Sequence, residues 1–418
     1  MYWYLSFLRP PPVSVPISQG SITITPQIAN DLRTELLFEP TEIRYTWQRT
    51  APTLGELVPG QEGISWNPPE STYKTCTLPL PAASKPGESW RLALHLGPTP
   101  SQLDVSHYAL PNPHIISVWS EPIHLVRGEP SSAGGIVRGV GADAAKGKKG
   151  DKKGKGAGGA AGKGKEEEGR KQGRITRDWT LGKRRLSIIE QTSFDLDKKI
   201  WDSGLALSGW LWRYLHLEQA NPSNQRVFDH LTHVDTPKII EIGSGTGLVS
   251  IALGLALRER DAAPGGIDIT ATDLDSAIEL MEENLKLNDF DQPPPPAPVN
   301  PLETETKAQG VRVKAAVLDW DESLPSWVDD PWPNMIIAAD VTYNTASFPA
   351  LVQTLTALLK PSHQAHRPPL LLAYKQRDEA ERDLWDMLRE RGIVLDKVDE
   401  IQGAEEEGQV EIWFGQAQ

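Results

Sequence analysis

The chain carries the stretch KIIEIGSGTG at residues 238–247, where a β-branched run is followed by three glycines at alternate positions. Three isoleucines in five residues, preceded by Pro237, predict a short buried strand of a parallel sheet. From Leu248 to Leu255 apolar residues recur at helical spacing and predict a helix that begins after the glycines. Glycine lets a ligand approach the backbone closely, and a helix N-terminus offers free N–H groups. The order strand, glycine turn, helix is therefore typical of a nucleotide-binding site.

The spacing of the glycines discriminates between nucleotide ligands. A dinucleotide fingerprint has glycine at its first, third and sixth positions, whereas Gly243, Gly245 and Gly247 occupy the first, third and fifth and Leu248 the sixth. Glu241 precedes the first glycine by two residues, where a carboxylate repels a pyrophosphate and attracts a cation. S-adenosylmethionine carries an ammonium and a sulfonium group, so the stretch favours it over NAD. A generic α/β turn with a chance cluster of glycines is the alternative that this stretch alone leaves open.

Composition limits the class of protein. The chain has 418 residues, enough for two domains or for one domain with a large extension, and its net charge of -13 argues against a broad basic surface for nucleic acid. An acidic balance is compatible with a basic protein substrate. The single cysteine, Cys76, permits no intrachain disulfide and no cysteine-based zinc site, and the nine histidines show no metal-ligand spacing, so we expect no metal.

Targeting signals are weak. The N-terminal MYWYLSFLRPPP lacks a basic flank and does not resemble a signal peptide, and no run of about 18 apolar residues predicts a membrane helix. We expect a soluble, cytoplasmic protein that functions as a monomer.

Eight lysines between Lys146 and Lys165 are a candidate nuclear signal or a weak nucleic-acid contact, although a solvated linker is the favoured interpretation.

Three regions differ in composition. Residues 1–130 contain short β-like runs, such as SITIT at residues 21–25, and we expect a β-rich accessory region there. An extension that only packs on the main domain is the alternative. Residues 131–173 are rich in glycine, alanine and lysine and predict a disordered linker, and residues 174–418 form the predicted main domain.

Acidic residues follow three further predicted strands of the main domain. They are Asp273 after residues 267–272, Asp319 after residues 311–318 and Asp340 after residues 335–339. Ligands of open α/β sheets bind at the carboxyl ends of the strands, so these side chains are expected to converge on one cleft. Asp273 suits the hydroxyls of a ribose, and Asp319 with Trp320 suits an adenine, which the indole can stack on.

The rest of the main domain predicts an α/β fold. Residues 200–215 carry an apolar face at helical spacing, and Trp201 lies just before that face, as either a core aromatic or the border of the cofactor pocket. Ser276 and Glu279 predict a capping box for the helix after the second strand. The last two strands, residues 393–398 and 410–414, have no helix between them, which predicts a mostly parallel sheet whose last strand is antiparallel.

From about residue 200 onward the chain resembles the seven-strand, class I S-adenosylmethionine-dependent methyltransferases. More narrowly it is similar to methyltransferase family 16, whose characterised members are largely protein-lysine methyltransferases. The matching stretches are Trp201-Asp202, EIGSGTGLVSI, TDLD, LDW and ADVTY. Asp340 to Tyr343 is similar to the D-x-x-Y signature of that family and is the most specific of these elements.

The resemblance implies a site and a reaction. The cofactor S-adenosyl-L-methionine is expected to contact Trp201, Glu241, Gly243, Gly245, Asp273, Trp320 and Ala339. Asp340 is expected to orient the incoming amine, and Tyr343 to lie beside the substrate. The implied substrate is a lysine of a protein of the translation-factor or chaperone type. A methyltransferase acting on a small molecule or N-heterocycle, and a non-catalytic partner-binding protein of the same fold, are the alternatives.

Overall fold

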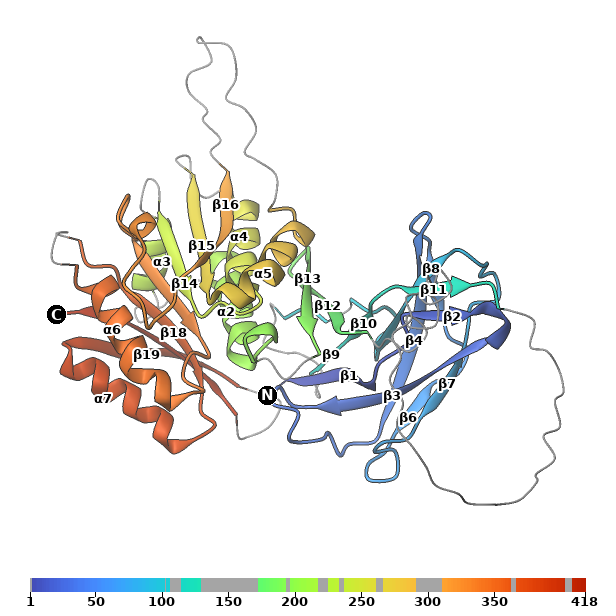
Figure 1. Cartoon of the computed structure of the whole chain (residues 1–418). Helices are drawn as coiled ribbons and strands as arrows, with labels where there is room; N and C mark the ends of the chain where they lie inside the picture. Colours follow the sequence, from blue (N-terminus) through green and yellow to red (C-terminus); the bar gives the residue numbers. More distant parts are fainter. Residues whose placement is uncertain are drawn as a thin grey trace, which may run out of the picture.

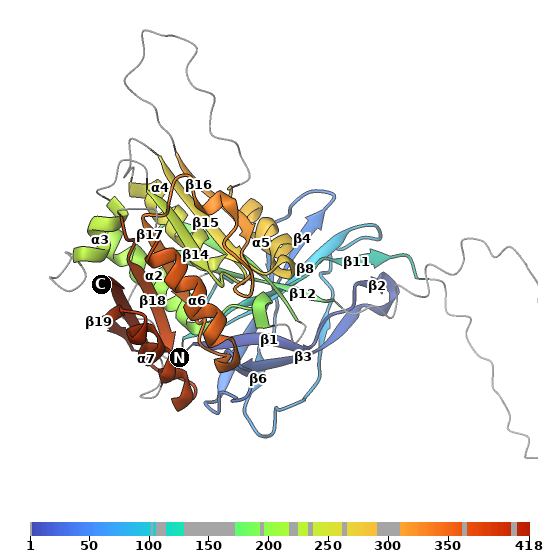
Figure 2. The same cartoon turned by 60° about the vertical axis from the view of Figure 1, so that its left-hand side comes forward.

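The computed structural model describes eleven ranges of the chain. They are residues 2–101, 103–105, 114–128, 172–192, 196–216, 225–232, 237–260, 266–290, 310–361, 366–402 and 408–418. The lysine-rich segment and the proline-rich residues 291–309 lie outside the described residues. The chain folds into a β-rich part and an α/β part that pack side by side (Figures 1 and 2).

The α/β part is built on a seven-stranded sheet. Its strands lie in the order β16 (Val311–Val317), β15 (Ile267–Asp273), β14 (Lys238–Ile242), β17 (Met335–Ala339), β18 (Leu370–Lys375), β20 (Val410–Ala417) and β19 (Ile393–Ile401). Strands β14 to β18 are parallel, and β20 is antiparallel to both of its neighbours. The predicted fold class, a class I methyltransferase sheet with an antiparallel last strand, is therefore confirmed.

Helices cover both faces of this sheet. They are α2 (Asp202–His216), α3 (Gln225–Thr232), α4 (Leu248–Arg260), α5 (Asp275–Leu287), α6 (Phe348–Leu359) and α7 (Asp383–Glu390). Because successive side chains of a strand face opposite sides, Ile239 packs into a core with α2 and α4, whereas Ile240 packs into a core with α6 and α7. None of the helices in the described part of the chain is long and apolar enough to cross a membrane.

The capping box predicted for α5 is wrong. The N-cap residue is Leu274, whose side chain makes no capping hydrogen bond. Ser276 lies inside the helix, and its hydroxyl donates to Asp197 Oδ2 at 3.1 Å. Ser276 therefore binds a segment from elsewhere in the chain instead of the start of its own helix.

The β-rich part contains two sheets. Its strands are β1 (Trp3–Arg9), β2 (Ser14–Pro16), β3 (Ser21–Ala29), β4 (Thr41–Ala51), β5 (Leu57–Pro59), β6 (Ile64–Trp66), β7 (Cys76–Pro79), β8 (Ser89–His95), β9 (Ile115–Ile116), β10 (Val118–Ser120), β11 (Ile123–Val126), β12 (Arg174–Leu181) and β13 (Arg184–Gln191). One sheet has the order β7-β3-β1-β9, and the other runs β13-β12-β10-β8-β11-β2 with β4 also paired to β8. The β-rich character predicted for this region is confirmed.

The hairpin of β12 and β13 joins the two parts. Its sequence lies in the predicted main domain, yet β12 hydrogen-bonds to β10, with Trp119 opposite Thr176. In Figure 1 the hairpin lies between the β-rich part and α5. The division of the chain at residues 130 and 173 stays a prediction.

The contact between the parts is close-packed. Tyr2, directly before β1, and Tyr4 of β1 belong to the same buried core as α2 and α4. A Cβ on Gly209 of α2 would lie 2.2 Å from the carbonyl oxygen of Val105, so only glycine fits there. The β-rich part therefore packs directly on α2, the first helix of the α/β part.

Candidate functional site

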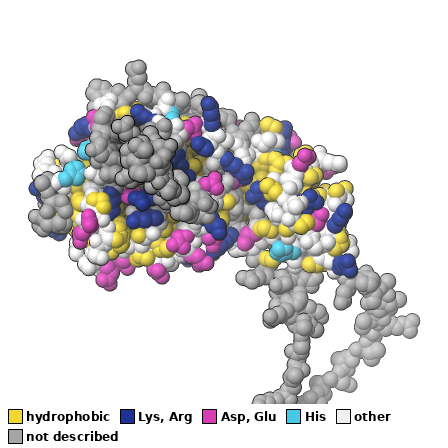
Figure 3. Space-filling view, turned by 90° about the horizontal axis from the view of Figure 1, so that it is seen from above, with side chains coloured by type: hydrophobic (Ala, Val, Ile, Leu, Met, Phe, Trp, Pro, Cys, Tyr) yellow, Lys and Arg dark blue, Asp and Glu magenta, His cyan; other side chains and the backbone are white. Residues whose placement is uncertain are grey.

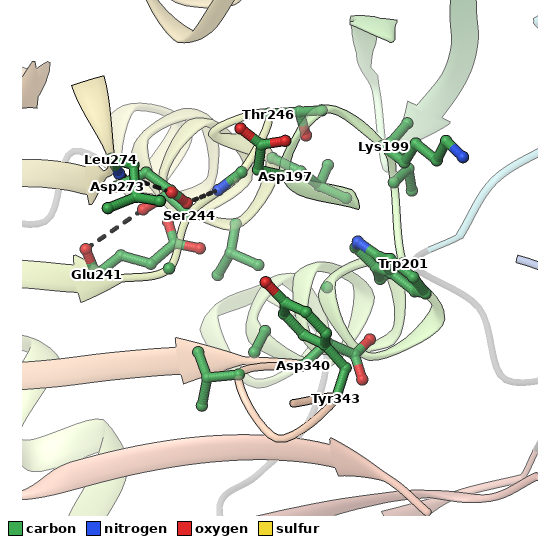
Figure 4. A pocket seen from close by; sticks show the side chains of 18 of the residues that line it. Asp197, Lys199, Trp201, Glu241, Ser244, Thr246, Asp273, Leu274, Asp340 and Tyr343 are labelled. Carbon is green, nitrogen blue, oxygen red and sulfur yellow. Dashed lines mark hydrogen bonds between the residues drawn. The ribbon is translucent and has the colours of Figure 1, made fainter. Parts of the chain in front are cut away.

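A cavity of about 250 Å³ lies at the carboxyl ends of β14, β15 and β17. All nine residues predicted for the site line it. They are Trp201, Glu241, Gly243, Gly245, Asp273, Trp320, Ala339, Asp340 and Tyr343. Figure 4 shows Glu241 and Asp273 at one end of the cavity and Trp201 and Tyr343 at the other.

The glycine turn forms the floor of this cavity and requires its glycines. Gly243 and Gly245 have φ angles of 62° and 54°, in the left-handed region that other residues rarely adopt. A Cβ on Gly243 would lie 2.8 Å from Val341 and 3.3 Å from the Trp320 ring. A Cβ on Gly245 would lie 3.0 Å from the carbonyl oxygen of Asp197. The backbone here leaves the cavity open only because both side chains are absent.

Glu241 is a buried carboxyl group, only 2% exposed, at the end of β14. Its Oε2 accepts hydrogen bonds from the backbone N–H of Ser250 at 2.9 Å and from the Ser250 hydroxyl at 2.5 Å. Burial outweighs these bonds and raises the pKa of Glu241 to about 7. A cation in the cavity would stabilise the ionised form, so this residue fits a positively charged ligand.

Asp273 connects the second strand to the glycine turn. Its Oδ2 accepts from the N–H of Gly245 at 2.8 Å, and its Oδ1 accepts from the N–H of Leu274 at 2.7 Å. Burial raises the pKa of Asp273 although both hydrogen bonds oppose the shift. Each oxygen has a second lone pair, so the carboxylate fits hydroxyl donors such as those of a ribose.

Trp201 and Tyr343 form the other end of the cavity. Their ring centroids lie 6.1 Å apart with the planes 8° from parallel. Tyr343 is 45% exposed, so this end is open to solvent. Partial burial, together with the carboxylates of Asp273 and Asp197, raises the pKa of Tyr343, which keeps its phenol neutral at physiological pH.

Asp340 lies at the end of β17, with a φ of 54° and only 4% of the residue exposed. Its Oδ1 accepts from Nη1 of Arg377 at 2.7 Å, and its Oδ2 accepts from the N–H of Ser203 at 2.9 Å. Both oxygens therefore already have partners within the protein. The predicted role of Asp340 in orienting an amine stays a prediction.

Sequence reasoning missed several residues at the site. Asp197 and Lys199 line the cavity from the segment before α2, where no strand end marked them. Arg377 follows the end of β18 by two residues, so the strand-end argument that found Asp273 applies to it as well. Asp31, which binds Arg377, comes from the β-rich part and carries no sequence signal.

The set of groups in the cavity fits S-adenosylmethionine. It combines a buried carboxyl for a cation, a carboxylate at the second strand for hydroxyls and an indole beside the glycines for a purine ring. Among the described residues, no three His, Cys, Asp or Glu side chains gather closely enough to hold a metal ion.

Comparison with known proteins points the same way. Residues 181–391 match the model of methyltransferase family 16, described as lysine methyltransferase. The protein-lysine N-methyltransferase EFM6 of Saccharomyces cerevisiae is 28% identical over 165 residues, which are 39% of this chain and 59% of the yeast protein. The protein N-lysine methyltransferase METTL21A of Xenopus tropicalis is 25% identical over 197 residues, which are 47% of this chain and 69% of the frog protein.

The chain also matches a further curated methyltransferase and solved structures. The EEF1A lysine methyltransferase 3 of Mus musculus is 31% identical over 124 residues, which are 30% of this chain and 41% of the mouse protein. The chain thus spans about half of the length of several curated relatives. Among solved structures, the fibrillarin of Aeropyrum pernix with natively bound S-adenosyl-L-methionine matches at 10% identity and a TM-score of 0.30, over 59% of this chain and 95% of that one.

Proposed function

Because the chain belongs to the lysine methyltransferase family, we propose that it transfers a methyl group from S-adenosylmethionine to a lysine side chain of a protein. The observation that carries the proposal is the cavity itself, which runs from the buried Glu241 and the half-buried Asp273 to the half-exposed Tyr343. One end fits the cofactor, and the other is open to a substrate side chain.

The cofactor end would hold S-adenosylmethionine through several contacts. Glu241 attracts its positive charge, Asp273 accepts from its hydroxyls, and the backbone at Gly243 and Gly245 leaves room for it. Trp320 borders the turn, where its ring would pack on the adenine. When bound, the group supplies an electrophilic methyl on a sulfonium.

The substrate end would prepare the lysine. A lysine attacks only after losing its proton, and removal from water beside Trp201 and Tyr343 lowers the pKa of an ammonium group. The neutral Tyr343 phenol can hold the amine by a hydrogen bond. Holding reactants in a near-attack geometry supplies about 7 to 11 kcal/mol. We assign no dedicated base, because the open end lets the proton pass to water.

Asp340 has a holding role in this proposal. Its carboxylate binds Arg377 and the start of α2, so it fixes the turn that carries Tyr343 three residues later. In this role Asp340 acts on the turn that carries Tyr343 and does not bind the amine itself.

A protein substrate is supported by surface charge and by the relatives. Acidic side chains gather along one edge of the α/β part in Figure 3, and α5 and α7 carry exposed carboxylates, among them Glu282 and Asp386. Such a surface favours a lysine-bearing, basic partner. The mouse relative is named for EEF1A, which supports a translation factor within the translation-factor or chaperone type.

Radiolabelled cofactor tests this function. The purified chain is incubated with S-adenosylmethionine carrying a labelled methyl group and a cell lysate, and the products are separated into proteins and small molecules. We expect label in one or a few protein bands, absent with Asp273→Ala. Label confined to small molecules would favour the small-molecule alternative. Cofactor binding by calorimetry without any transfer would favour a non-catalytic protein.

A further inference from the structure

We propose that Asp31, in the β-rich part, is a positioning residue of the active site that acts through Arg377 on Asp340 and Trp201. The inference rests on the proposed methyl transfer and adds to it a contribution from outside the α/β sheet. It implies that the β-rich part completes the site in addition to any role in partner choice.

Arg377 bridges the two parts of the molecule. Its Nη1 donates to Asp340 Oδ1 and its Nη2 donates to Asp31 Oδ2, both at 2.7 Å. The side chains of Asp31 and Asp340 are 1% and 3% exposed, and that of Arg377 is 11% exposed. Charge-assisted hydrogen bonds of this length in a buried place fix the guanidinium firmly.

The same two carboxylates bind the start of α2. Asp31 Oδ2 accepts from the N–H of Asp202 at 3.3 Å, and Asp340 Oδ2 accepts from the N–H of Ser203 at 2.9 Å. The first N–H groups of a helix have no partner within it and favour negative charge. One carboxylate from each part therefore fixes the helix directly after Trp201.

Two further side chains complete the junction cluster, by which we mean Asp31, Asp202, Asp340, Lys375 and Arg377. Lys375 Nζ lies 2.6 Å from Asp202 Oδ2 and 3.6 Å from Asp31 Oδ1. Tyr4 of β1 donates its hydroxyl to Asp202 Oδ1 at 2.8 Å. Although burial disfavours its ionised form, Arg377 and Lys375 lower the pKa of Asp31, so it is ionised at neutral pH. Loss of its charge leaves Nη2 of Arg377 facing a neutral oxygen, which holds a buried guanidinium more weakly than a carboxylate does.

The position of Arg377 matters because it touches the site directly. Its guanidinium carbon lies 5.0 Å from the centroid of the Trp201 ring, within the range of a cation–π interaction. The Trp201 ring in turn stacks on Tyr343. Asp340 holds a left-handed φ that is costly for an aspartate, so its hydrogen bonds are needed to keep it. A guanidinium released by Asp31 would loosen both the aromatic pair and this turn.

A purely structural bridge is the competing explanation, and the chain offers a matched control for it. Arg174 of β12 and Glu283 of α5 also join the two parts, with their charged atoms 2.6 Å apart. Neither residue lines the cavity. Glu283→Gln therefore removes an ion pair between the same parts without touching the site.

The test compares Asp31→Asn, Asp31→Glu and Glu283→Gln in the full chain. We expect Asp31→Asn to lower kcat by about tenfold to a hundredfold through misplacement of the reacting groups, with the Kd of S-adenosylmethionine changed less than about threefold because Glu241 and Asp273 are untouched. Asp31→Glu keeps the charge and should recover part of kcat. Glu283→Gln should keep kcat within about twofold, since this pair, with side chains 31% and 37% exposed, does not line the cavity and is partly screened by water.

A second readout does not depend on activity. The indole N–H signal of Trp201, identified by its loss in Trp201→Phe, should shift in the NMR spectrum of ligand-free Asp31→Asn and not in that of Glu283→Gln. If Asp31→Asn does not fold, Arg377→Lys removes the bridge while keeping a positive charge and carries the same test.

The outcomes separate the two proposals. If the wild-type protein is active, a kcat of Asp31→Asn equal to the wild-type kcat would overturn the inference. Equal losses of kcat in Asp31→Asn and Glu283→Gln would also overturn it. A wild-type chain that binds cofactor but transfers no methyl group would refute the proposed function. In that case the Trp201 signal decides the inference alone, and an unshifted signal overturns it.

Discussion

Trp201 and Tyr343 lie with their rings 6.1 Å apart and 8° from parallel, one before the first helix of the α/β part and the other after its fourth sheet strand in chain order. The pair lines the open end of a cavity whose other end is lined by carboxyl groups.

Removal of the Tyr343 hydroxyl should slow the reaction without weakening cofactor binding. Tyr343→Phe keeps the ring beside Trp201 and loses the hydrogen bond to the amine, so we expect kcat to fall by about tenfold, the loss of roughly one hydrogen bond in the transition state. Steady-state kinetics and calorimetry measure the two effects. Tyr73→Phe, at a 74% exposed position of the β-rich part, is the control and should change neither kcat nor the Kd of the cofactor. Wild-type kinetics in Tyr343→Phe would remove the phenol from the mechanism.

Cofactor affinity should depend on the ionisation of Glu241. Since the pKa of this group is raised to about 7 and the ligand is cationic, the ligand selects the ionised form. Affinity should therefore rise as the pH rises through about 7 and level off above it. Calorimetric titrations between about pH 5.5 and pH 8.5 give the slope, which is at most about tenfold per pH unit for one proton. Glu241→Gln has no such proton, so its profile contains only the ligand's own titration. Identical profiles for the two proteins would contradict the prediction.

The ligand-free protein should show the opposite dependence in its stability. A carboxyl whose pKa is higher in the folded than in the unfolded state binds its proton more tightly when folded. The contribution of Glu241 is therefore fully present below its unfolded pKa, near 4.5, and is lost as the pH rises through about 7. We therefore expect the free energy of unfolding, measured with urea at several pH values, to fall less with rising pH for Glu241→Gln than for wild type. If the free energy of unfolding falls equally with pH in both proteins, Glu241 is already ionised at neutral pH without ligand.

An alanine at Gly245 should affect binding and stability together. Its φ of 54° and the 3.0 Å approach of a Cβ to the Asp197 carbonyl oxygen predict both backbone strain and displacement of the segment over the turn. We expect a loss of about 1 to 2 kcal/mol in the free energy of unfolding, the usual cost of a left-handed residue, and at least a tenfold weaker cofactor Kd. Gly20→Ala is the matched control, because its φ is 71° and no atom lies within 4 Å of the added Cβ. It should lose similar stability and keep full affinity.

Loss of the Asp340 carboxylate should destabilise the fold as well as the site. Asp340→Ala leaves Arg377 and the N–H of Ser203 without a shared acceptor, and breaking a buried ion pair from one side costs about 3 to 5 kcal/mol. Arg312→Ala removes an ion pair at a 58% exposed side chain and should cost less than about 1 kcal/mol. Chemical denaturation measures both. A loss below about 1 kcal/mol in Asp340→Ala would show that the carboxylate does not hold the turn.

The sequence alone predicted the main sheet and the location of the cavity because both follow from local patterns. Apolar runs of the right length mark the strands, and parallel strands bring their carboxyl ends to one edge, so Glu241, Asp273 and Asp340 had to meet. The three glycines identified the turn by their spacing. The same argument, applied to the fifth strand, would have included Arg377.

The junction of the two parts was beyond such reasoning. Asp31 and Arg377 are separated by 346 residues, and no periodicity relates two such positions. The hairpin of β12 and β13 could not be assigned to a sheet because pairing partners depend on tertiary packing. The capping box failed for a related reason, since Ser276 finds a partner in Asp197, from a distant segment, that a local rule does not consider.

The central claim is methylation of protein lysines, and peptide mass spectrometry tests it most directly. A lysate treated with the purified chain and S-adenosylmethionine bearing a deuterated methyl group is digested and compared with one treated with Tyr343→Phe. We expect deuterated methyl groups on lysine side chains of a small number of proteins, and less deuterium at the same lysines after treatment with Tyr343→Phe. Labelled small molecules or other side chains, with no labelled lysine, would contradict it.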